Sequence, residues 1–585
     1  MMMNKGDRIE IVIEDMSFEG QGIGRAEGMV VFVPGTVPGD RALAEITKVK
    51  KSYCFSRLVE ILEESPDRTE EFDCQSCEEG CGGCVYSKLS YDGQLRLKER
   101  QVREKIARLG GIADPLIRPI IGMAKEDNEG MGPYRYRNKA QFPVSTGGII
   151  TRKGGIVENL GEPAVGFYMK KSHRVVDCPD CYIQSMAAMA AADALRTFME
   201  EDNITAWDPK WEKGLMRHLI VKIGFATRDV MVILVINGKG IPNAQKLVEM
   251  LDDAIYEAGY NLESVAVNIN KDVDTGEIMG DDTQIIAGSN VITDMIGELT
   301  FEISPTSFYQ VNPVQVTRLY DKVREYCDFG SYEEPPVIMD LYCGVGTIGL
   351  YCADAAEAVV GIEVVKDAVI NANRNAVINN IVNARFIQGK AEEILPEYMA
   401  GSDKADVQLS EQLQKSRIAI MDPPRAGSRP ELMDAIADSN VDRIIYVSCD
   451  PATLGRDVKY LEEKGFSFIE ATPVDMFPWT SHVETVVQLV RKKPDTYIDI
   501  TVDMDELDLT SSEAKATYDK IKDYIFDKHR VKVSSLYIAQ VKQKHGIIER
   551  DCYNNPKKDN PNQPQCPPEK VKLIEEALRH FKMIS

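Results

Sequence analysis

A cysteine and a glutamate in the second half of the chain have the types and spacing for covalent catalysis. Cys449 follows an apolar run, residues 443–447, that predicts a buried strand, and Glu484 comes thirty-five residues later. A thiol at the carboxyl end of a strand can attack an electrophile, and a carboxylate on a later strand can remove a proton. Taken alone, a single cysteine is more often a small core residue, so the other motifs must choose between these interpretations.

A glycine-rich loop follows the strand expected over residues 337–340. Three glycines have G-x-G-x-x-G spacing: Gly344, Gly346 and Gly349. Such glycines let the backbone turn sharply beside a ligand, and Glu363, which closes the next expected strand, can accept hydrogen bonds from a ribose. The spacing alone leaves three alternatives open: a nicotinamide dinucleotide, S-adenosylmethionine, or a tight turn without ligand. Asp340, directly before the loop, favours S-adenosylmethionine.

An Asp-Pro-Pro-Arg motif, residues 422–425, ends the fourth strand expected in the same sheet. Ligands bind at this edge of a doubly wound sheet. A double proline can be only a rigid turn, but with Asp422 before it the motif indicates a nucleic-acid methyltransferase. A dehydrogenase is disfavoured because it would explain neither this motif nor Cys449.

The thirteen cysteines are unevenly spread. Four of them lie within eleven residues: Cys74, Cys77, Cys81 and Cys84. Cys178 and Cys181 form a further pair. In a cytoplasmic protein such clustering indicates metal or iron–sulfur ligation more often than disulfides. Zinc competes with an iron–sulfur cluster as the interpretation.

Composition bounds the class of protein. The 585 residues are 44% hydrophobic and 28% charged, which is enough for about three to four globular domains. Residues 1–8 are polar, and no apolar stretch there has signal-peptide or membrane-span length, so we expect a cytoplasmic protein without a membrane partner. The net charge of −23 predicts that any nucleic-acid site is local. Residues 96–139 are a candidate for such a local site, because they contain eleven Lys/Arg against six Asp/Glu.

Periodicity predicts four segments. Residues 1–62 alternate in short runs typical of a small closed β-barrel. Residues 68–300 predict an α+β domain, in which a basic helix over 91–118 is expected to pack on the catalytic domain. Residues 301–492 alternate strands and helices as in a parallel, doubly wound sheet. Residues 493–585 form a helical extension to which the sequence assigns no role.

Together these motifs make the chain resemble the RNA uridine-5-methyltransferase family, in its iron–sulfur type that modifies 23S ribosomal RNA and carries an N-terminal TRAM domain. The resemblance covers about residues 4–491 and rests on five motifs: Cys81-Gly-Gly-Cys84, residues 304–313, residues 340–346, residues 422–425 and residues 448–451. It implies that Cys449 is the nucleophile, adding to carbon 6 of uracil, and that Glu484 is the general base. It also implies four contacts to S-adenosylmethionine: Gln310, Tyr342, Glu363 and Asp422.

The resemblance further implies a [4Fe-4S] cluster held by four thiolates: Cys74, Cys81, Cys84 and Cys181. The first ligand stays open between Cys74 and Cys77, because neither has the family's spacing of five residues before Cys81. The fourth stays open between Cys181 and Cys178. The methyl transfer needs no electrons, so we expect the cluster to be structural or to shape the RNA surface.

The partner that the resemblance implies is 23S ribosomal RNA, whose target uridine leaves a single-stranded or loop region to enter the pocket. We expect a monomer and no DNA partner. Two alternatives remain: a transfer-RNA uridine-5-methyltransferase, which the barrel and the cysteines disfavour, and a non-catalytic iron–sulfur RNA-binding protein. The latter would be expected to lose Cys449, Glu484 or Gln310, and all three are present.

Two segments are candidates for RNA contacts. Residues 134–139 interleave aromatic and basic side chains, which could stack unpaired bases and pair phosphates or could form a strand with a solvated basic face. Four cations of the basic helix are expected on a solvated face: Lys98, Arg100, Arg103 and Arg108.

Overall fold

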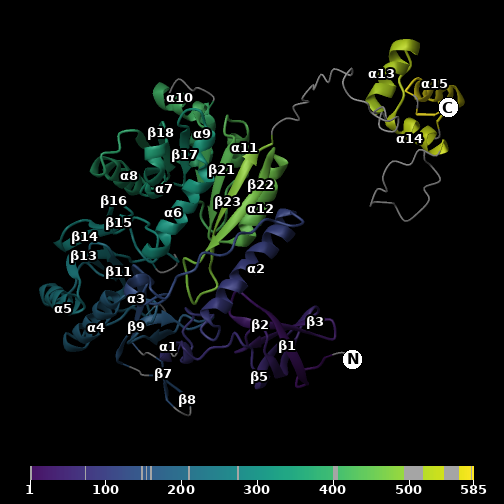
Figure 1. Ribbon diagram of the computed structural model, residues 1–585. Coiled ribbons are helices and arrows are strands. Elements are labelled where there is room, and N and C mark those ends of the chain that lie inside the picture. Colours follow the sequence, from purple (N-terminus) through teal and green to yellow (C-terminus); the bar gives the residue numbers. More distant parts are fainter. Residues whose placement is uncertain are drawn as a thin grey trace. The chain divides into compact units, whose positions relative to one another are not determined.

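The computed structural model divides into two compact units, Met1–Lys493 and Pro494–Ser585, and each is described by itself (Figure 1). The structure describes residues 3–72, 74–146, 149–152, 155–158, 161–208, 211–272, 276–399, 406–492, 518–545, 566–581 and 583–584.

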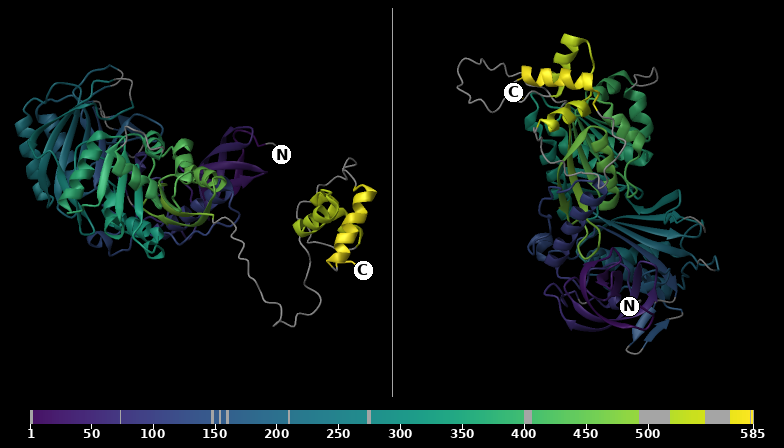
Figure 2. Two further views of the ribbon diagram at one scale, coloured as in Figure 1. Left: turned by 90° about the horizontal axis from the view of Figure 1, so that it is seen from above. Right: turned by 90° about the vertical axis from the view of Figure 1, so that its right-hand side faces the viewer.

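The N-terminal strands close into a small barrel (purple in Figures 1 and 2) with the order β1-β2-β3-β5-β4. Its strands are β1 (Arg8–Met16), β2 (Gln21–Ala26), β3 (Met29–Pro34), β4 (Arg41–Val49) and β5 (Tyr53–Glu63). Alternate side chains such as Ile11, Ile13 and Val31 fill its interior, as the period of two requires. The predicted small closed barrel is confirmed.

Helix α2 (Tyr91–Gly110) connects the barrel to the sheet of residues 337–491, which is described below. Arg100 pairs with Asp15 of β1 at 2.6 Å, while the apolar side of the helix packs on α12 (Pro451–Glu463), beside it in Figure 1. The helix ends where Gly111 adopts a positive φ of 75°, short of residue 118. Along the chain a four-residue helix precedes α2 and another follows it: α1 (Gln75–Glu78) and α3 (Asp127–Gly130).

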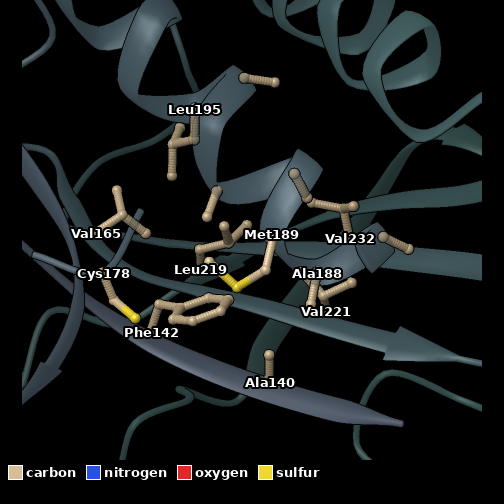
Figure 3. Packing of buried hydrophobic residues seen from close by; sticks show 14 of the residues in the cluster. Ala140, Phe142, Val165, Cys178, Ala188, Met189, Leu195, Leu219, Val221 and Val232 are labelled. Carbon is tan, nitrogen blue, oxygen red and sulfur yellow. The ribbon is translucent and has the colours of Figure 1, made fainter. Parts of the chain in front are cut away.

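A seven-stranded mixed sheet follows, in the order β10-β9-β6-β11-β12-β13-β14. Its strands are β6 (Lys139–Thr146), β9 (Pro163–Tyr168), β10 (Val175–Asp177), β11 (Met216–Ile223), β12 (Asp229–Ile236), β13 (Asn261–Ile269) and β14 (Asp282–Gly288); β7 (Ile149–Arg152) and β8 (Gly155–Glu158) pair separately. Leu219 and Val221 face helices α4 (Met186–Glu201) and α5 (Ala244–Glu257), as Figure 3 shows for α4. Ile220, between them, faces the hairpin β15 (Ile292–Ile296) and β16 (Leu299–Ile303).

The second seven-stranded sheet has the order β19-β18-β17-β20-β21-β23-β22. Its strands are β17 (Val337–Leu341), β18 (Ala358–Glu363), β19 (Ala384–Gln388), β20 (Ile418–Met421), β21 (Arg443–Ser448), β22 (Phe466–Val474) and β23 (Glu484–Arg491). The predicted parallel, doubly wound sheet is found, with the exception of one strand. β23 is antiparallel to both neighbours because it returns from β22 as a hairpin and inserts beside β21.

Helices cover both faces of this sheet: α6 (Pro313–Cys327), α7 (Thr347–Cys352), α8 (Lys366–Ile378), α9 (Ala391–Met399), α10 (Val407–Lys415), α11 (Pro430–Ala437) and α12. The second unit contains α13 (Tyr518–His529), α14 (Ser535–Lys544) and α15 (Pro568–His580), which bury a core of their own. Within the described ranges, no helix has the length and apolarity to cross a bilayer.

Candidate active site

Cys449 and Glu484 meet at one edge of the catalytic sheet. Cys449 directly follows β21, in the turn before α12, and the Asp450 side chain caps that helix by accepting from Ala452 N at 2.8 Å. Glu484 begins β23, and its neighbour Thr485 pairs with Ser448 in the sheet. The antiparallel course of β23 therefore puts the carboxylate at the edge where the thiol lies.

Burial and neighbouring charges raise the pKa of both groups. Burial, and then the charge of Glu484, raises the pKa of the half-buried Cys449 thiol to about 12. Glu484 is only 4% exposed, and its Oε2 has no hydrogen-bond partner among the described residues. Burial and the charge of Asp422 raise the pKa of Glu484, while Arg425 opposes this rise. A buried carboxyl without a partner is expensive, which is typical of a functional site.

The glycine-rich loop lies between β17 and α7. Asp340 accepts a hydrogen bond from Gly349 N at 2.8 Å, and Gly344 N donates to Glu363 Oε2 at 3.1 Å. Gly346 has a φ of +79°, and a Cβ there would lie 2.7 Å from the Phe386 ring. The loop thus requires glycine at that position, and it holds the Glu363 carboxylate against the backbone where a ribose could bind.

Gln310 and Asp422 come together from distant parts of the chain. Gln310 Nε2 donates to Asp422 Oδ2 at 3.3 Å, and Asn138 Nδ2 donates to the Gln310 carbonyl at 2.7 Å. Burial raises the pKa of Asp422 to about 7. Since Asp422 follows β20 and the glycine loop follows the adjacent β17, the two meet where the strand order reverses, which is the usual ligand position in such sheets.

One cleft of about 1740 Å³ contains all six side chains predicted for catalysis and cofactor binding: Gln310, Tyr342, Glu363, Asp422, Cys449 and Glu484. Tyr342 adopts a φ of +64°, a strained conformation for a residue with a side chain. The sequence interpretation missed three exposed aromatic residues in this cleft: Phe18 (59% exposed), Phe308 (61% exposed) and Tyr168 (42% exposed). For Phe308, its place inside the recognised motif 304–313 was the available signal.

The predicted cluster ligands line the same cleft. Cys74, Cys81, Cys84 and Cys181 are all buried, and so is Cys178, whereas Cys77 is half-buried. The thiol of Cys77 interacts with those of Cys74 and Cys84, and Cys178 interacts with Cys181. The Cys178 contact lowers the pKa of Cys181 to about 7, whereas burial raises the pKa of Cys81 to about 11.

These thiols have the donor chemistry of an iron–sulfur site. Across the part of the chain that the structure describes, however, no group of three or more His, Cys, Asp or Glu side chains has an arrangement that could hold a metal ion. Cys178 also belongs to the apolar core under α4, where it lies beside Phe142 (Figure 3).

Two predictions about RNA contacts are corrected. Tyr136 is fully buried and donates to the Pro478 carbonyl at 3.0 Å, so its ring is a core residue and cannot stack on a base. Tyr134 is partly buried, and its ring already stacks on that of Trp479. Arg137 and Lys139 of the same segment do line the cleft. Lys98 does not lie on a solvated face, because it is fully buried against Asp475.

Family models and relatives agree on one class of protein. Residues 191–492 match the model described as tRNA (Uracil-5-)-methyltransferase, and residues 3–59 match the TRAM domain. An uncharacterized RNA methyltransferase of Caldanaerobacter subterraneus is 41% identical over 493 residues, which cover 84% of this chain and 100% of the relative. Another, from Halalkalibacterium halodurans, is 38% identical over 490 residues, 84% of this chain and 98% of the relative.

A solved structure is also similar. It is the Pyrococcus abyssi tRNA (uracil-54, C5)-methyltransferase in complex with S-adenosyl-L-homocysteine, with 27% identity and a TM-score of 0.59. The similarity covers 82% of this chain and 100% of the neighbour.

Proposed function

Because the chain belongs to the tRNA (uracil-5-)-methyltransferase family, and is thus an S-adenosylmethionine-dependent RNA methyltransferase, we propose that it methylates carbon 5 of a uridine in 23S ribosomal RNA. One observation carries the proposal: Cys449 and Glu484, whose Oε2 has no hydrogen-bond partner among the described residues, share a cleft with the glycine-rich loop. Bound S-adenosylmethionine would supply an electrophilic methyl group there.

In the proposed mechanism Cys449 opens the reaction. Its sulfur, after losing its proton to solvent water, bonds to carbon 6 of the flipped uracil, and the electrons of the C5–C6 double bond move onto O4 to form the enolate. Carbon 5 is now nucleophilic and takes the methyl group, whose bond to the sulfonium breaks to leave S-adenosylhomocysteine. Glu484 removes the carbon-5 proton, and the double bond re-forms as the C6–sulfur bond breaks and the thiolate leaves.

The surroundings of both groups favour their protonated forms, so each must lose a proton during the reaction. A thiol whose pKa is raised to about 12 is protonated at neutral pH, so its proton must leave before or during attack. Glu484 must be ionised when it acts as the base, although burial and the charge of Asp422 raise its pKa on balance; Arg425, which opposes this rise, is the group that favours the ionised form. Phe308, exposed in the same cleft, offers a ring on which the uracil could stack.

The test uses variants of the two reacting side chains. With 23S ribosomal RNA from cells that lack the protein, Cys449→Ala is expected to form no 5-methyluridine. Glu484→Gln should form the carbon-6 bond but fail to release it, so a covalent protein–RNA species should accumulate on denaturing gels. Cys566→Ala, which changes a half-buried cysteine in the second unit, is the matched control and should retain activity. Full turnover by Cys449→Ala would refute the mechanism.

Transfer RNA is the second candidate substrate, because the similar Pyrococcus abyssi structure is that of a tRNA (uracil-54, C5)-methyltransferase. The barrel together with the cysteine-rich segment favours ribosomal RNA. Mapping 5-methyluridine in both RNAs from cells without this protein would separate the two. Loss confined to transfer RNA would overturn the ribosomal assignment.

We also propose that Cys74, Cys81, Cys84 and Cys181 hold a [4Fe-4S] cluster that fixes the segments carrying them. Their common burial at one cleft supports this, although their side chains are not arranged to hold a metal ion in the described structure. Cys178 is buried at the same cleft, so only the family resemblance favours Cys181 as the fourth ligand. After anaerobic purification we expect about four irons and four sulfides per chain.

Single Ser substitutions decide the ligands. Cys178→Ser is expected to keep the iron and Cys181→Ser to lose it. Comparing Cys74→Ser with Cys77→Ser in the same analysis identifies the first ligand. Stoichiometric zinc without iron would reject the cluster.

A further inference from the structure

Two aromatic rings from distant segments meet inside the active-site cleft. Phe18 lies in the turn between β1 and β2 of the barrel, and His482 lies in the loop between β22 and β23, two residues before Glu484. Their ring centroids are 4.8 Å apart with an interplanar angle of 81°, an edge-to-face contact. Both side chains line the cleft that contains Cys449.

The turn that carries Phe18 is held on several sides. Gly20 has a φ of +77°, and a Cβ there would lie 2.4 Å from the Val85 carbonyl, so the turn sits directly on the cysteine-rich segment. Glu19 pairs with Lys171 at 2.7 Å, and Ser17 O accepts from Gly20 N at 2.9 Å. The exposed ring of Phe18 is therefore presented in a defined position, although burying it would have been favourable.

His482 supports the ring from the catalytic side. Burial and the charge of Arg425 lower the pKa of His482 to about 4, so its imidazole is neutral at physiological pH. It also contacts Phe477 at a centroid distance of 5.7 Å. Phe18, His482 and Phe477 thus form a continuous uncharged aromatic group beside the reacting carboxylate.

The surroundings of the rings indicate the ligand. Arg137, Lys139 and Arg425 line the same cleft, so cations and an exposed aromatic ring occur together. A cationic groove with aromatic rings suits single-stranded nucleic acid, because the cations pair with phosphates while each base offers a face for stacking.

We propose that Phe18, backed by His482, is a stacking site for an unpaired nucleobase adjacent to the target uridine. This proposal rests on the proposed function, because it takes the neighbouring nucleotide to be the target uridine. On this proposal the barrel contributes one specific ring to the active-site cleft, and it selects RNA whose target is flanked by an unstacked base.

Binding can be measured apart from catalysis. In a Cys449→Ala background, the affinity for a fluorescein-labelled oligouridylate of about ten nucleotides is read by anisotropy. Phe18→Ala is expected to raise Kd by about 5- to 150-fold, since stacking contributes about 1–3 kcal/mol per base. Phe18→Trp should retain the affinity. Tyr256→Ala, which removes an exposed ring on α5 that does not line the cleft, is the control and should bind like the parent.

A second oligomer separates stacking from other effects. When two central nucleotides are replaced by abasic units, the parent and Phe18→Ala should bind equally weakly, because no base is left to stack. A Kd for Phe18→Ala within twofold of the parent, or an equal loss with the abasic oligomer, would overturn the stacking site. These binding assays do not depend on catalysis, because the thiol is absent from every variant used. If the chain that keeps Cys449 forms no 5-methyluridine but the Phe18 effect on binding is seen, only the proposed reaction is refuted.

Discussion

A buried ion pair anchors the loop that leads to Glu484, and its removal gives the sharpest stability prediction. Lys98 of α2 donates to Asp475 Oδ1 at 2.6 Å and to the Phe477 carbonyl at 3.0 Å. Both charged side chains are fully buried. Residues 475–483 then run from this pair to the first residue of β23. The ion pair therefore fixes to α2 the loop that leads to the candidate base, Glu484.

The magnitude follows from what each substitution leaves behind. Lys98→Met strands the Asp475 carboxylate, whose Oδ2 has no hydrogen-bond partner in the described part of the chain. Leaving one buried charge unpaired costs about 3–5 kcal/mol, whereas replacing both partners by apolar groups is often nearly neutral. We therefore expect Lys98→Met to lower the free energy of unfolding by about 3–5 kcal/mol, and Lys98→Met/Asp475→Leu to restore most of it.

Urea unfolding followed by Trp479 emission is the suitable assay, with Trp207 and Trp211 replaced by Phe. Trp479 lies in the loop after Asp475, is buried, and donates from Nε1 to the Pro133 carbonyl at 2.9 Å, so its emission reports on this region. Arg108→Met, on an exposed part of the same helix, is the control and should change stability by less than about 0.5 kcal/mol. The reasoning is refuted if Lys98→Met costs under about 1 kcal/mol, or if the double variant is as unstable as the single one.

Three further predictions concern the catalytic site and the second unit. Methylation should fall as the pH drops, because burial and the charge of Asp422 raise the pKa of Glu484 and its base form is lost on protonation; Asp422→Asn should move this limb of the kcat/KM profile to lower pH, and an unmoved limb contradicts the coupling. Gly346→Ala should weaken S-adenosylhomocysteine binding at least about tenfold by calorimetry, since its Cβ meets a ring at 2.7 Å, whereas Gly330→Ala, with open space around it, should not. Deleting residues 494–585 should leave the Tm of the remainder unchanged by scanning calorimetry, because the second unit buries its own core; a lowered Tm would show that the units stabilise each other.

The sequence predicts well those parts of the site that depend on short motifs at the ends of strands. Strands followed by glycines or by Asp-Pro-Pro-Arg identify where parallel strands end, and such ends meet at one sheet edge. Asp340, Asp422 and Cys449 could be brought together on that basis, and the structure does so. The alternation of residues 8–63 likewise determines the barrel.

What the sequence could not predict depends on partners far along the chain. Lys98 has the spacing of a solvated helical cation, and only the approach of Asp475, 377 residues away, explains its burial. Tyr136 looks like a base-stacking residue until the Pro478 carbonyl provides a buried acceptor for its hydroxyl. The contact between Phe18 and His482 joins the barrel to the loop between β22 and β23, and no local pattern encodes it.

The reversed direction of β23 is the feature on which the active site most depends. The strand has eight residues, Glu484–Arg491, and at about 3.3 Å per residue it spans roughly 26 Å. Were it parallel to β21, its first residue would lie at the opposite edge of the sheet, that distance from Cys449. A hairpin from β22 turns it round, so that Ser448 at the end of β21 pairs with Thr485 at the start of β23. Inserting one antiparallel strand thus places the Glu484 carboxylate beside the Cys449 thiol, at the edge of the sheet where the glycine-rich loop lies. The loop 475–483 reverses the direction of the chain, and it is the segment that Lys98 anchors.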